Sequence, residues 1–257
     1  SFDVVSEKEL RTKPDIIGFS VFSPNYMFYK CAAEAIRKKS KIPILVGGVL
    51  PTLKPELFME NTCCDYVFRG EAEPVIMELV EKISTGKYHD MPNLAYRGEG
   101  GRIVYNEMKS LVDDLDEIPF YDKSFYSNDS DILFMLTSRG CVLSCSYCSA
   151  GEYSRITVKP GSGVVRKRKV DCVIEEIKQA LQRKPYKEIF FYDDFFITTT
   201  QWLSEFTERY SKEIGLPYSC EVFPATVTRD IASLLAKSGC KAVFMGFQTA
   251  NDAYKKK

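Results

Sequence analysis

Histidine is almost absent from this chain of 257 residues, which contains only His89. The formal charge is balanced, with 35 basic and 35 acidic residues, so there is no global attraction to nucleic acid or to a membrane surface. No run approaches the roughly eighteen apolar residues of a membrane span, and the N-terminus lacks a basic-then-apolar signal pattern. We therefore expect a cytoplasmic protein with no membrane span and no nucleic acid partner.

Cysteine, in contrast, is abundant, and the odd count of nine argues against a complete disulfide framework. Three of the nine lie close together as Cys141, Cys145 and Cys148. They follow an apolar run, Ile132–Leu136, and a glycine turn at Gly140. Such a run predicts a buried parallel strand, so we expect the three thiols on one loop at the carboxyl end of that strand.

Three closely spaced thiolates can hold three irons of a four-iron, four-sulfur (4Fe-4S) cluster and leave the fourth iron open to a substrate or cofactor. Zinc and a disulfide are the alternatives for such a loop. Zinc is disfavoured because the loop offers neither a fourth cysteine nor a histidine. A disulfide is disfavoured because nothing marks the chain as secreted. The loop therefore indicates a catalytic iron–sulfur cluster.

With the aromatic Tyr147 directly before Cys148, this loop resembles the cluster loop of the radical S-adenosylmethionine (radical SAM) enzymes. The resemblance implies that the amino and carboxylate groups of SAM chelate the open iron. It also implies that the reduced cluster cleaves SAM to a 5′-deoxyadenosyl radical.

The first third of the chain alternates strand-like and helix-like segments after a short strand-like run at residues 2–5. Strands are expected at residues 14–23, 42–46 and 65–70, and helices at 25–38, 53–60 and 73–83. This alternation predicts an α/β fold with a doubly wound, Rossmann-like parallel sheet. Ligands of such sheets bind beyond the carboxyl ends of the strands.

Three stretches at those ends, residues 15–20, 45–52 and 68–73, resemble the cobalamin-binding domain that precedes the cluster in one subclass of radical SAM enzymes. The resemblance implies cobalamin contacts at Ser20, Phe22, Gly47, Gly48, Gly70 and Glu71. It also implies that a first strand and helix of this domain lie before Ser1. The first strands contain no histidine that could replace the lower cobalt ligand, so we expect cobalamin to bind without one.

The rest of the chain predicts a hairpin at residues 93–106, a linker at 111–130 and then a second alternating region. In that region strands are expected at 132–136, 188–192, 218–223 and 241–247, and helices at 170–183, 200–214 and 228–238. This pattern predicts about four strands of a partial (βα) barrel. The resemblance to the radical SAM enzymes implies that it is a (βα)6 radical SAM barrel, with further strands expected beyond Lys257. The predicted domains are a cobalamin-binding α/β domain at 1–90, a hairpin and linker at 91–130, and the partial barrel at 131–257.

Candidate SAM contacts lie at the strand ends of this barrel. They are Tyr147, Asp193, Asp194, Glu221 and Gln248. The two aspartates resemble an Asp-Asp-x-Phe stretch in which an acidic residue contacts the SAM amino group, and the sequence does not choose between them. Gln248 stands in a stretch that resembles Gly-x-Glu-Ser-Gly of the family, so it keeps a hydrogen-bonding amide and lacks the charge.

A basic run at residues 166–169 closes the polar segment that follows the cysteine loop. Such runs are typical of a solvated face, and contact with SAM or an anionic substrate is the alternative.

Together these patterns predict a cobalamin-dependent radical SAM enzyme, in first place a methyltransferase that acts on an unactivated carbon. The alternatives are a radical SAM cyclase or oxidative enzyme, with or without cobalamin, and a non-catalytic cofactor- or metal-binding module. The implied cofactors are a 4Fe-4S cluster, SAM and cobalamin. The expected partners are a small-molecule or peptide substrate and an electron donor such as flavodoxin or ferredoxin. The sequence assigns no catalytic residue, substrate or oligomeric state.

Overall fold

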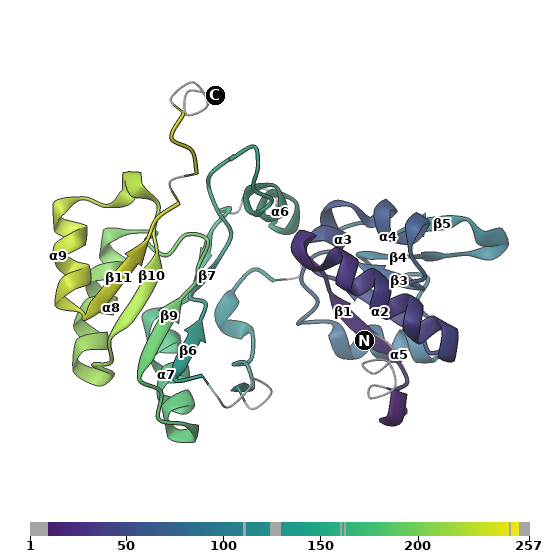
Figure 1. Cartoon of the computed structure of the whole chain (residues 1–257), viewed down its shortest axis with the longest axis horizontal. Coiled ribbons are helices and arrows are strands. Elements are labelled where there is room, and N and C mark those ends of the chain that lie inside the picture. Colours follow the sequence, from purple (N-terminus) through teal and green to yellow (C-terminus); the bar gives the residue numbers. More distant parts are fainter. Residues whose placement is uncertain are drawn as a thin grey trace. The chain divides into compact units, whose positions relative to one another are not determined.

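A computed structural model describes residues 10–109, 112–123, 130–159, 161, 163–246 and 248–251. The chain forms two compact units, which Figure 1 shows coloured along the sequence. The first unit comprises the residues up to Asp113 together with 144–162, and the second comprises 114–143 together with the residues from Gly163 onwards. The strand predicted at residues 2–5 lies outside the described residues.

In the first unit, five strands form one sheet in the order β1-β2-β3-β4-β5. The first three strands, β1 (Ile17–Ser20), β2 (Ile44–Gly47) and β3 (Tyr66–Phe68), are parallel. The predicted hairpin forms β4 (Leu94–Arg97) and β5 (Ile103–Tyr105), and it continues the same sheet by antiparallel pairing of β4 with β3. The sheet is therefore mixed, whereas the alternation of strands and helices predicted a parallel one.

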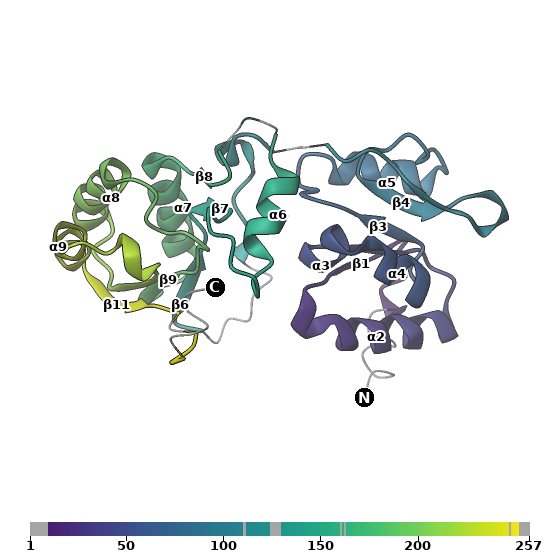
Figure 2. The same cartoon turned by 90° about the horizontal axis from the view of Figure 1, so that it is seen from above.

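Helices cover both faces of this sheet, as Figure 2 shows for α2 (Tyr26–Lys39) and α5 (Ile76–Ser84). On one face, α2 and α4 (Pro55–Asn61) bury Ile36 and Phe58 against Val46. On the other face, α5 packs against Leu45 and its neighbours. Alternate residues of each strand thus serve two cores, which confirms the doubly wound arrangement.

A short helix, α3 (Val49–Leu53), precedes α4, where one helix was predicted at residues 53–60. The break falls at Lys54, whose backbone has φ −137° and ψ 61°. Pro55 explains the break, because a proline disfavours the helical conformation in the residue before it.

The second unit contains a parallel sheet of four strands in the order β11-β10-β9-β6. Its strands are β6 (Ile132–Met135), β9 (Glu188–Phe191), β10 (Tyr218–Glu221) and β11 (Cys240–Phe244). The helices α7 (Val170–Arg183), α8 (Thr200–Glu213) and α9 (Arg229–Lys237) alternate with these strands and bury Ile177, Phe206 and Leu235 in one core with them. Figure 2 shows α7 and α8 on one side of the sheet. This arrangement confirms the predicted partial barrel.

Three smaller elements lie near the cysteine loop. The strands β7 (Ser138–Arg139) and β8 (Arg166–Lys167) pair antiparallel in the second unit. The helix α6 (Ala150–Thr157) belongs to the first unit and packs against α3. The sequence pattern indicated only a polar segment here, so this helix was not predicted. The 3-10 helices are η1 (Ser23–Asn25), η2 (Glu99–Gly101), η3 (Leu115–Glu117) and η5 (Pro224–Thr226).

No helix in the described part of the chain is both long and apolar enough to span a membrane.

Candidate active site

The cysteine loop follows the carboxyl end of β6, as predicted. Gly140 has a φ of 102°, a left-handed backbone that glycine adopts without strain, and it turns the chain directly before Cys141. None of the three cysteines forms a disulfide with another described residue; Cys141 is buried and Cys148 is exposed. The backbone amide of Cys148 donates to the carbonyl of Cys145 at 3.1 Å, which forms a tight turn. Tyr147, in the same turn, has an exposed fraction of 67%.

Among the residues that the structure describes, no group of three or more histidine, cysteine, aspartate or glutamate side chains is gathered closely enough to hold a metal ion. The structure thus does not bring the three cysteines together as a ligand set. Metal sites commonly assemble with their metal, because binding free energy and folding are coupled. The donor set itself, three thiols on one short loop, fits an iron–sulfur cluster with one open iron.

The two adjacent aspartates after β9 differ sharply in their surroundings. Asp193 is fully buried. Its Oδ1 accepts hydrogen bonds from the backbone amide of Thr137 at 2.9 Å, from the Thr137 hydroxyl at 2.8 Å and from the Ser138 hydroxyl. Asp193 therefore connects the end of β9 to the segment that leads into the cysteine loop, and its Oδ1 is engaged in these hydrogen bonds.

Lys167 lies beside Thr137 and Asp193 and forms a buried polar group with them. Its ammonium donates to the Thr137 hydroxyl and to the carbonyl of Phe196, and lies 3.9 Å from Asp193 Oδ1. It also lies 3.9 Å from the ring centroid of Trp202. Burial lowers the pKa of Lys167 to about 8, although the nearby Asp193 carboxylate acts in the opposite direction.

Asp194, in contrast, is exposed at the carboxyl end of β9. The protein around its carboxylate partly excludes solvent and raises its pKa, and the adjacent Asp193 charge adds to this effect. Glu221, the last residue of β10, is also exposed, and its pKa is raised first by partial burial and then by the charges of Asp194 and Asp193. Asp194 and Glu221 therefore lie at the carboxyl ends of two paired parallel strands, β9 and β10.

Gln248, the fifth predicted SAM contact of the barrel, lies beyond the end of β11. Its side chain is exposed, and its backbone has a φ of 62°. The left-handed conformation turns the chain sharply at this point.

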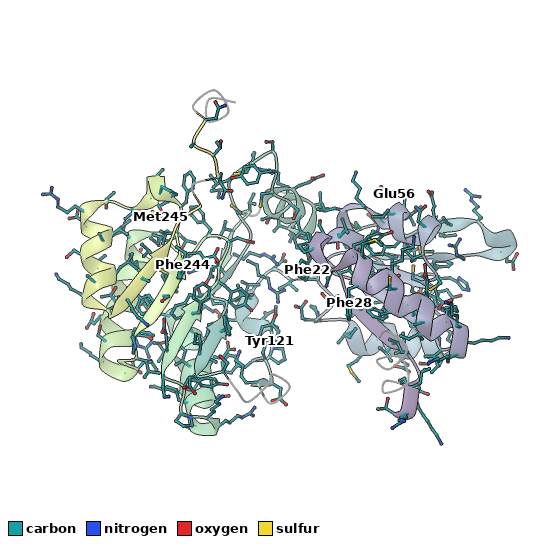
Figure 3. The ribbon with its side chains drawn as sticks, viewed as in Figure 1. Phe22, Phe28, Glu56, Tyr121, Phe244 and Met245 are labelled. Carbon is teal, nitrogen blue, oxygen red and sulfur yellow. The ribbon has the colours of Figure 1, made fainter. Side chains whose placement is uncertain are left out.

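The face of the second sheet that lies opposite the helices carries exposed aromatic side chains. Phe190 makes a tilted ring contact with Phe134 on one neighbouring strand and an edge contact with Phe244 across the sheet, at centroid distances of 5.9 Å and 5.4 Å. Figure 3 labels Phe244. A cleft of about 490 Å³ opens on this face. Its lining residues are Tyr121, Lys123, Ser130, Ile132, Leu133, Phe134, Leu136, Tyr186, Phe190 and Tyr192.

In the first unit, the predicted cobalamin residues after β1 and β2 lie side by side. Ser20 and Gly47 are partners in the register of the two strands, and the amide of Val21 donates to the carbonyl of Gly47 at 2.8 Å. Gly48 has a φ of 103°. A Cβ atom on Gly48 would lie 3.1 Å from the Ser20 hydroxyl, so only glycine fits this turn.

Thr52 links the residues after β3 to this edge of the sheet. It belongs to the 45–52 stretch, and no role was predicted for it. The Thr52 hydroxyl donates to the carbonyl of Gly48 at 2.7 Å and accepts from the amide of Gly70 at 2.8 Å. Glu71 is buried, whereas Phe22, labelled in Figure 3, has an exposed fraction of 52%. The available signal for this link was a threonine about one helical turn after a glycine pair.

The basic run was predicted on a solvated face, and this prediction is wrong for its central residues. Lys167 enters the buried group described above, and the Arg168 side chain is only 10% exposed. Arg168 forms an ion pair with Glu176. Lys169 is the exposed member of the run. The run therefore ties parts of the second unit together, because buried carboxylates from distant segments meet its charges.

A parallel sheet with a cysteine loop after its first strand and carboxylates after the next two defines an α/β enzyme of the barrel type, preceded here by a cofactor-binding domain. Family comparison agrees with this class. The B12 binding domain family matches residues 3–80, and the Radical SAM superfamily matches residues 135–257. The chain therefore carries a B12 binding domain followed by a radical SAM domain.

Two curated relatives match almost the whole chain. The chain is 29% identical over 249 residues to an uncharacterized methyltransferase of Pyrococcus horikoshii, an alignment that covers 93% of this chain and 52% of the relative. It is 25% identical over 266 residues to the anaerobic magnesium-protoporphyrin IX monomethyl ester cyclase of Rubrivivax gelatinosus, with 97% of this chain and 46% of the relative covered. The chain spans about half the length of these relatives.

Two solved structures share the fold. The radical SAM methyltransferase TsrM from Kitasatospora setae, with tryptophan substrate and a SAM analog bound, superposes with a TM-score of 0.74 at 17% identity, over 98% of this chain and 52% of that chain. The cobalamin-dependent radical SAM enzyme OxsB, with aqua-cobalamin and SAM bound, gives a TM-score of 0.76 at 18% identity, over 100% of this chain and 38% of that chain.

Proposed function

We propose that this chain forms the cofactor-binding half of a cobalamin-dependent radical SAM enzyme. The observation that carries the proposal is the position of three cysteines, on the loop after the first strand of a parallel sheet, in a chain that also has a B12 binding domain. When bound, the three cofactors would supply reductive cleavage of SAM, a carbon-centred radical on the substrate and a methyl group for transfer.

In this proposal, Cys141, Cys145 and Cys148 hold the cluster. The thiols fit this role because they follow one another at a spacing that suits three irons. The protein's remaining task at this edge is to hold SAM in one orientation next to the open iron.

Asp194 and Glu221 are the residues best suited to the SAM amino group. Both are exposed at neighbouring strand ends, and their negative charges act on the same volume. A cationic amine placed there would relieve the repulsion between the carboxylates and lower their raised pKa values. Asp193 is not suited to this role, because its carboxylate is buried and accepts three hydrogen bonds from Thr137 and Ser138. Gln248 and Tyr147 are exposed and remain candidates for hydrogen bonds to SAM.

The carboxyl edge of the first sheet is the proposed cobalamin site. Gly47 and Gly48 leave the backbone beside Ser20 uncovered by side chains. Gly70 is connected to Gly48 through the hydroxyl of Thr52. Bare backbone at these points allows a bulky ring to approach closely. The only histidine, His89, is exposed and lies in the segment after α5, so the protein would not supply a histidine ligand to cobalt from this edge.

Methyl transfer to carbon is the proposed reaction, supported by the similarity to relatives described as methyltransferases, including one from Pyrococcus horikoshii. Cyclisation is the second candidate, because a comparable similarity links the chain to the Rubrivivax gelatinosus cyclase. The aromatic face around Phe134, Phe190 and Phe244 supports a flat or apolar small-molecule or peptide substrate. A low-potential donor such as flavodoxin or ferredoxin would supply the electron.

The direct test is anaerobic incubation of the reconstituted protein with SAM and dithionite, followed by quantification of 5′-deoxyadenosine. We expect the product from the wild-type protein and from Cys31→Ala, which changes a cysteine on α2, and none from Cys148→Ala. Methyl-deuterated SAM separates the two candidate reactions, since only methyl transfer carries the label into the product. Equal 5′-deoxyadenosine from Cys148→Ala and the wild-type protein would contradict the proposal.

A further inference from the structure

A buried polar group lies at the start of the cysteine loop and has no part in the proposed chemistry. Its members are Thr137, Asp193 and Lys167. Thr137 and Asp193 are fully buried, and the Lys167 side chain is 10% exposed. The three residues come from the end of β6, the end of β9 and β8.

The Thr137 hydroxyl links the two charges of this group. It accepts a hydrogen bond from the Lys167 ammonium at 2.5 Å and donates one to Asp193 Oδ1 at 2.8 Å. The ammonium lies 3.9 Å from Oδ1, which is longer than a direct hydrogen bond. The threonine hydroxyl therefore relays the interaction between the lysine and the aspartate.

Backbone hydrogen bonds also hold the segment of Thr137 and Ser138 in place. Ser138 is the partner of Lys167 in the β7 and β8 ladder, and the amide of Arg168 donates to the carbonyl of Thr137 at 2.9 Å. Thr137 and Ser138 thus have their backbone and side chains fixed in the residues directly before the turn at Gly140 and Cys141.

Stability alone does not account for such a group. Burying a lysine and a carboxylate costs desolvation free energy, and apolar residues of similar volume are often at least as stabilising. What the group supplies is fixed geometry. It joins two segments that the proposed function uses, since Thr137 leads to Cys141 and Asp193 immediately precedes Asp194.

We propose that Thr137, Asp193 and Lys167 are positioning residues that hold the start of the cysteine loop in register with Asp194. The proposal rests on the assignment of Cys141 as a cluster ligand and Asp194 as a SAM contact. Loss of the Thr137 hydroxyl should loosen the loop at Cys141 and leave the fold of the second unit intact.

The first test needs no cofactor. The metal-free protein is exposed anaerobically to a short pulse of iodoacetamide, and labelling of each cysteine is measured by mass spectrometry. Cys141 is 8% exposed and Cys220, in the core of the same sheet, is fully buried. We expect Thr137→Val to raise Cys141 labelling roughly threefold to tenfold, the factor that one lost hydrogen bond gives in a local opening equilibrium. The conservative variant Thr137→Ser, which keeps a hydroxyl, should restore wild-type labelling.

Cys220 separates local loosening from unfolding, because it should stay protected in every variant. Asp193→Asn provides a second variant, since Asp193 Oδ2 is a buried oxygen without a hydrogen-bond partner among the described residues and an amide nitrogen can take its place. A neutral amide oxygen accepts the Thr137 bonds less strongly than a carboxylate, so Cys141 labelling should rise here as well. Unchanged Cys141 labelling in both variants would overturn the proposal.

The second test reports on the loaded protein. After reconstitution with iron and sulfide, the reduced cluster is observed by electron paramagnetic resonance with and without SAM. We expect Thr137→Val to lose or broaden the spectral change that SAM causes, and Thr137→Ser to keep it. A spectrum of Thr137→Val that matches the wild type in both states would overturn the positioning role and leave the proposed function standing. A wild-type protein that takes up no iron, with Cys141 labelling still dependent on Thr137, would overturn the proposed function alone.

Discussion

A Cβ atom on Gly48 would lie 2.8 Å from the carbonyl oxygen of Val21 and 2.9 Å from its backbone nitrogen. Both atoms belong to the main chain directly after β1, so they cannot move aside as a flexible side chain does. The turn after β2 is therefore packed against the end of β1 with no space for a side chain.

The substitution Gly48→Ala should accordingly displace this turn and weaken cobalamin binding. We expect a loss of affinity of roughly tenfold or more, because alanine is strained at a positive φ and its methyl group meets fixed backbone. Binding is measured by the cobalamin retained after desalting, followed by its absorption spectrum. Gly18→Ala is the matched control, because a Cβ on Gly18 meets nothing within 4 Å. Equal retention by the two variants would remove the Gly48 turn from the cobalamin site.

Asp194→Asn should weaken SAM binding and leave the cluster in place. A hydrogen bond to a charged group contributes about 1.5–3 kcal/mol, which corresponds to roughly tenfold to a hundredfold in affinity. The measurement is equilibrium dialysis of SAM against the reconstituted protein, with iron content determined in parallel. Wild-type SAM affinity in Asp194→Asn would assign the amino group to another residue, and Glu221→Gln would then be the variant to measure.

The stability that depends on Lys167 should increase with pH. Burial lowers its pKa to about 8 in the folded protein, whereas a lysine in an unfolded chain titrates near about 10.4. Between these two pKa values the unfolded state binds more protons than the folded state, so the free energy of unfolding rises as pH rises through this window. It decreases again as pH is lowered toward the folded pKa.

The comparison of wild type with Lys167→Met isolates this effect. We expect the difference in free energy of unfolding between them to shift in favour of the wild type by on the order of 2 kcal/mol between pH 8 and pH 10. Urea unfolding followed by fluorescence suits this measurement, because the single tryptophan, Trp202, lies in the second unit. A difference that stays constant across this range would mean that Lys167 keeps an ordinary pKa.

Glu176 should be essential for the stability of the second unit. Its carboxylate is buried on α7 between Arg168 and the ammonium of Lys123, which lies 2.8 Å away. Glu176→Gln removes the charge that faces Lys123 and the nearer of the two carboxylates beside Arg168, whose other partner, Asp116, lies 3.7 Å away. Removal of one partner from a buried ion pair costs about 3–5 kcal/mol. Glu175→Gln, on the exposed side of the same helix, should change the free energy of unfolding by less than about 0.5 kcal/mol. Similar unfolding curves for the two variants would show that the buried charges are not needed.

Much of the fold follows from local patterns in the sequence. Apolar residues at helical spacing predicted α7 at residues 170–183, and the structure has the same bounds. The hairpin followed from its glycine turn. Its docking against β3 did not, because strand pairing between distant segments leaves no local signal. The helix α6 was missed for a related reason, since it contains a glycine and packs against α3, which lies about a hundred residues earlier in the sequence.

The candidate site could be predicted in its chemistry and only partly in its geometry. The cysteine spacing and the adjacent aspartates indicated the right residue types at the ends of parallel strands. The difference between Asp193 and Asp194 depends on Thr137, Ser138 and Lys167, which meet Asp193 only in the folded sheet. The basic run was misplaced for the same reason, because a charged run does not reveal which buried carboxylates it will meet.

The most direct test of the central claim is the metal content of the anaerobically reconstituted protein. The protein is incubated with iron, sulfide and hydroxocobalamin and desalted, and its bound iron, zinc, sulfide and cobalt are measured beside those of Cys148→Ser. We expect about four irons with matching sulfide and about one cobalt per chain, and loss of the iron alone in the variant. Zinc without sulfide in the wild-type protein, or iron without cobalt, would contradict the assignment of a cobalamin-dependent radical SAM enzyme.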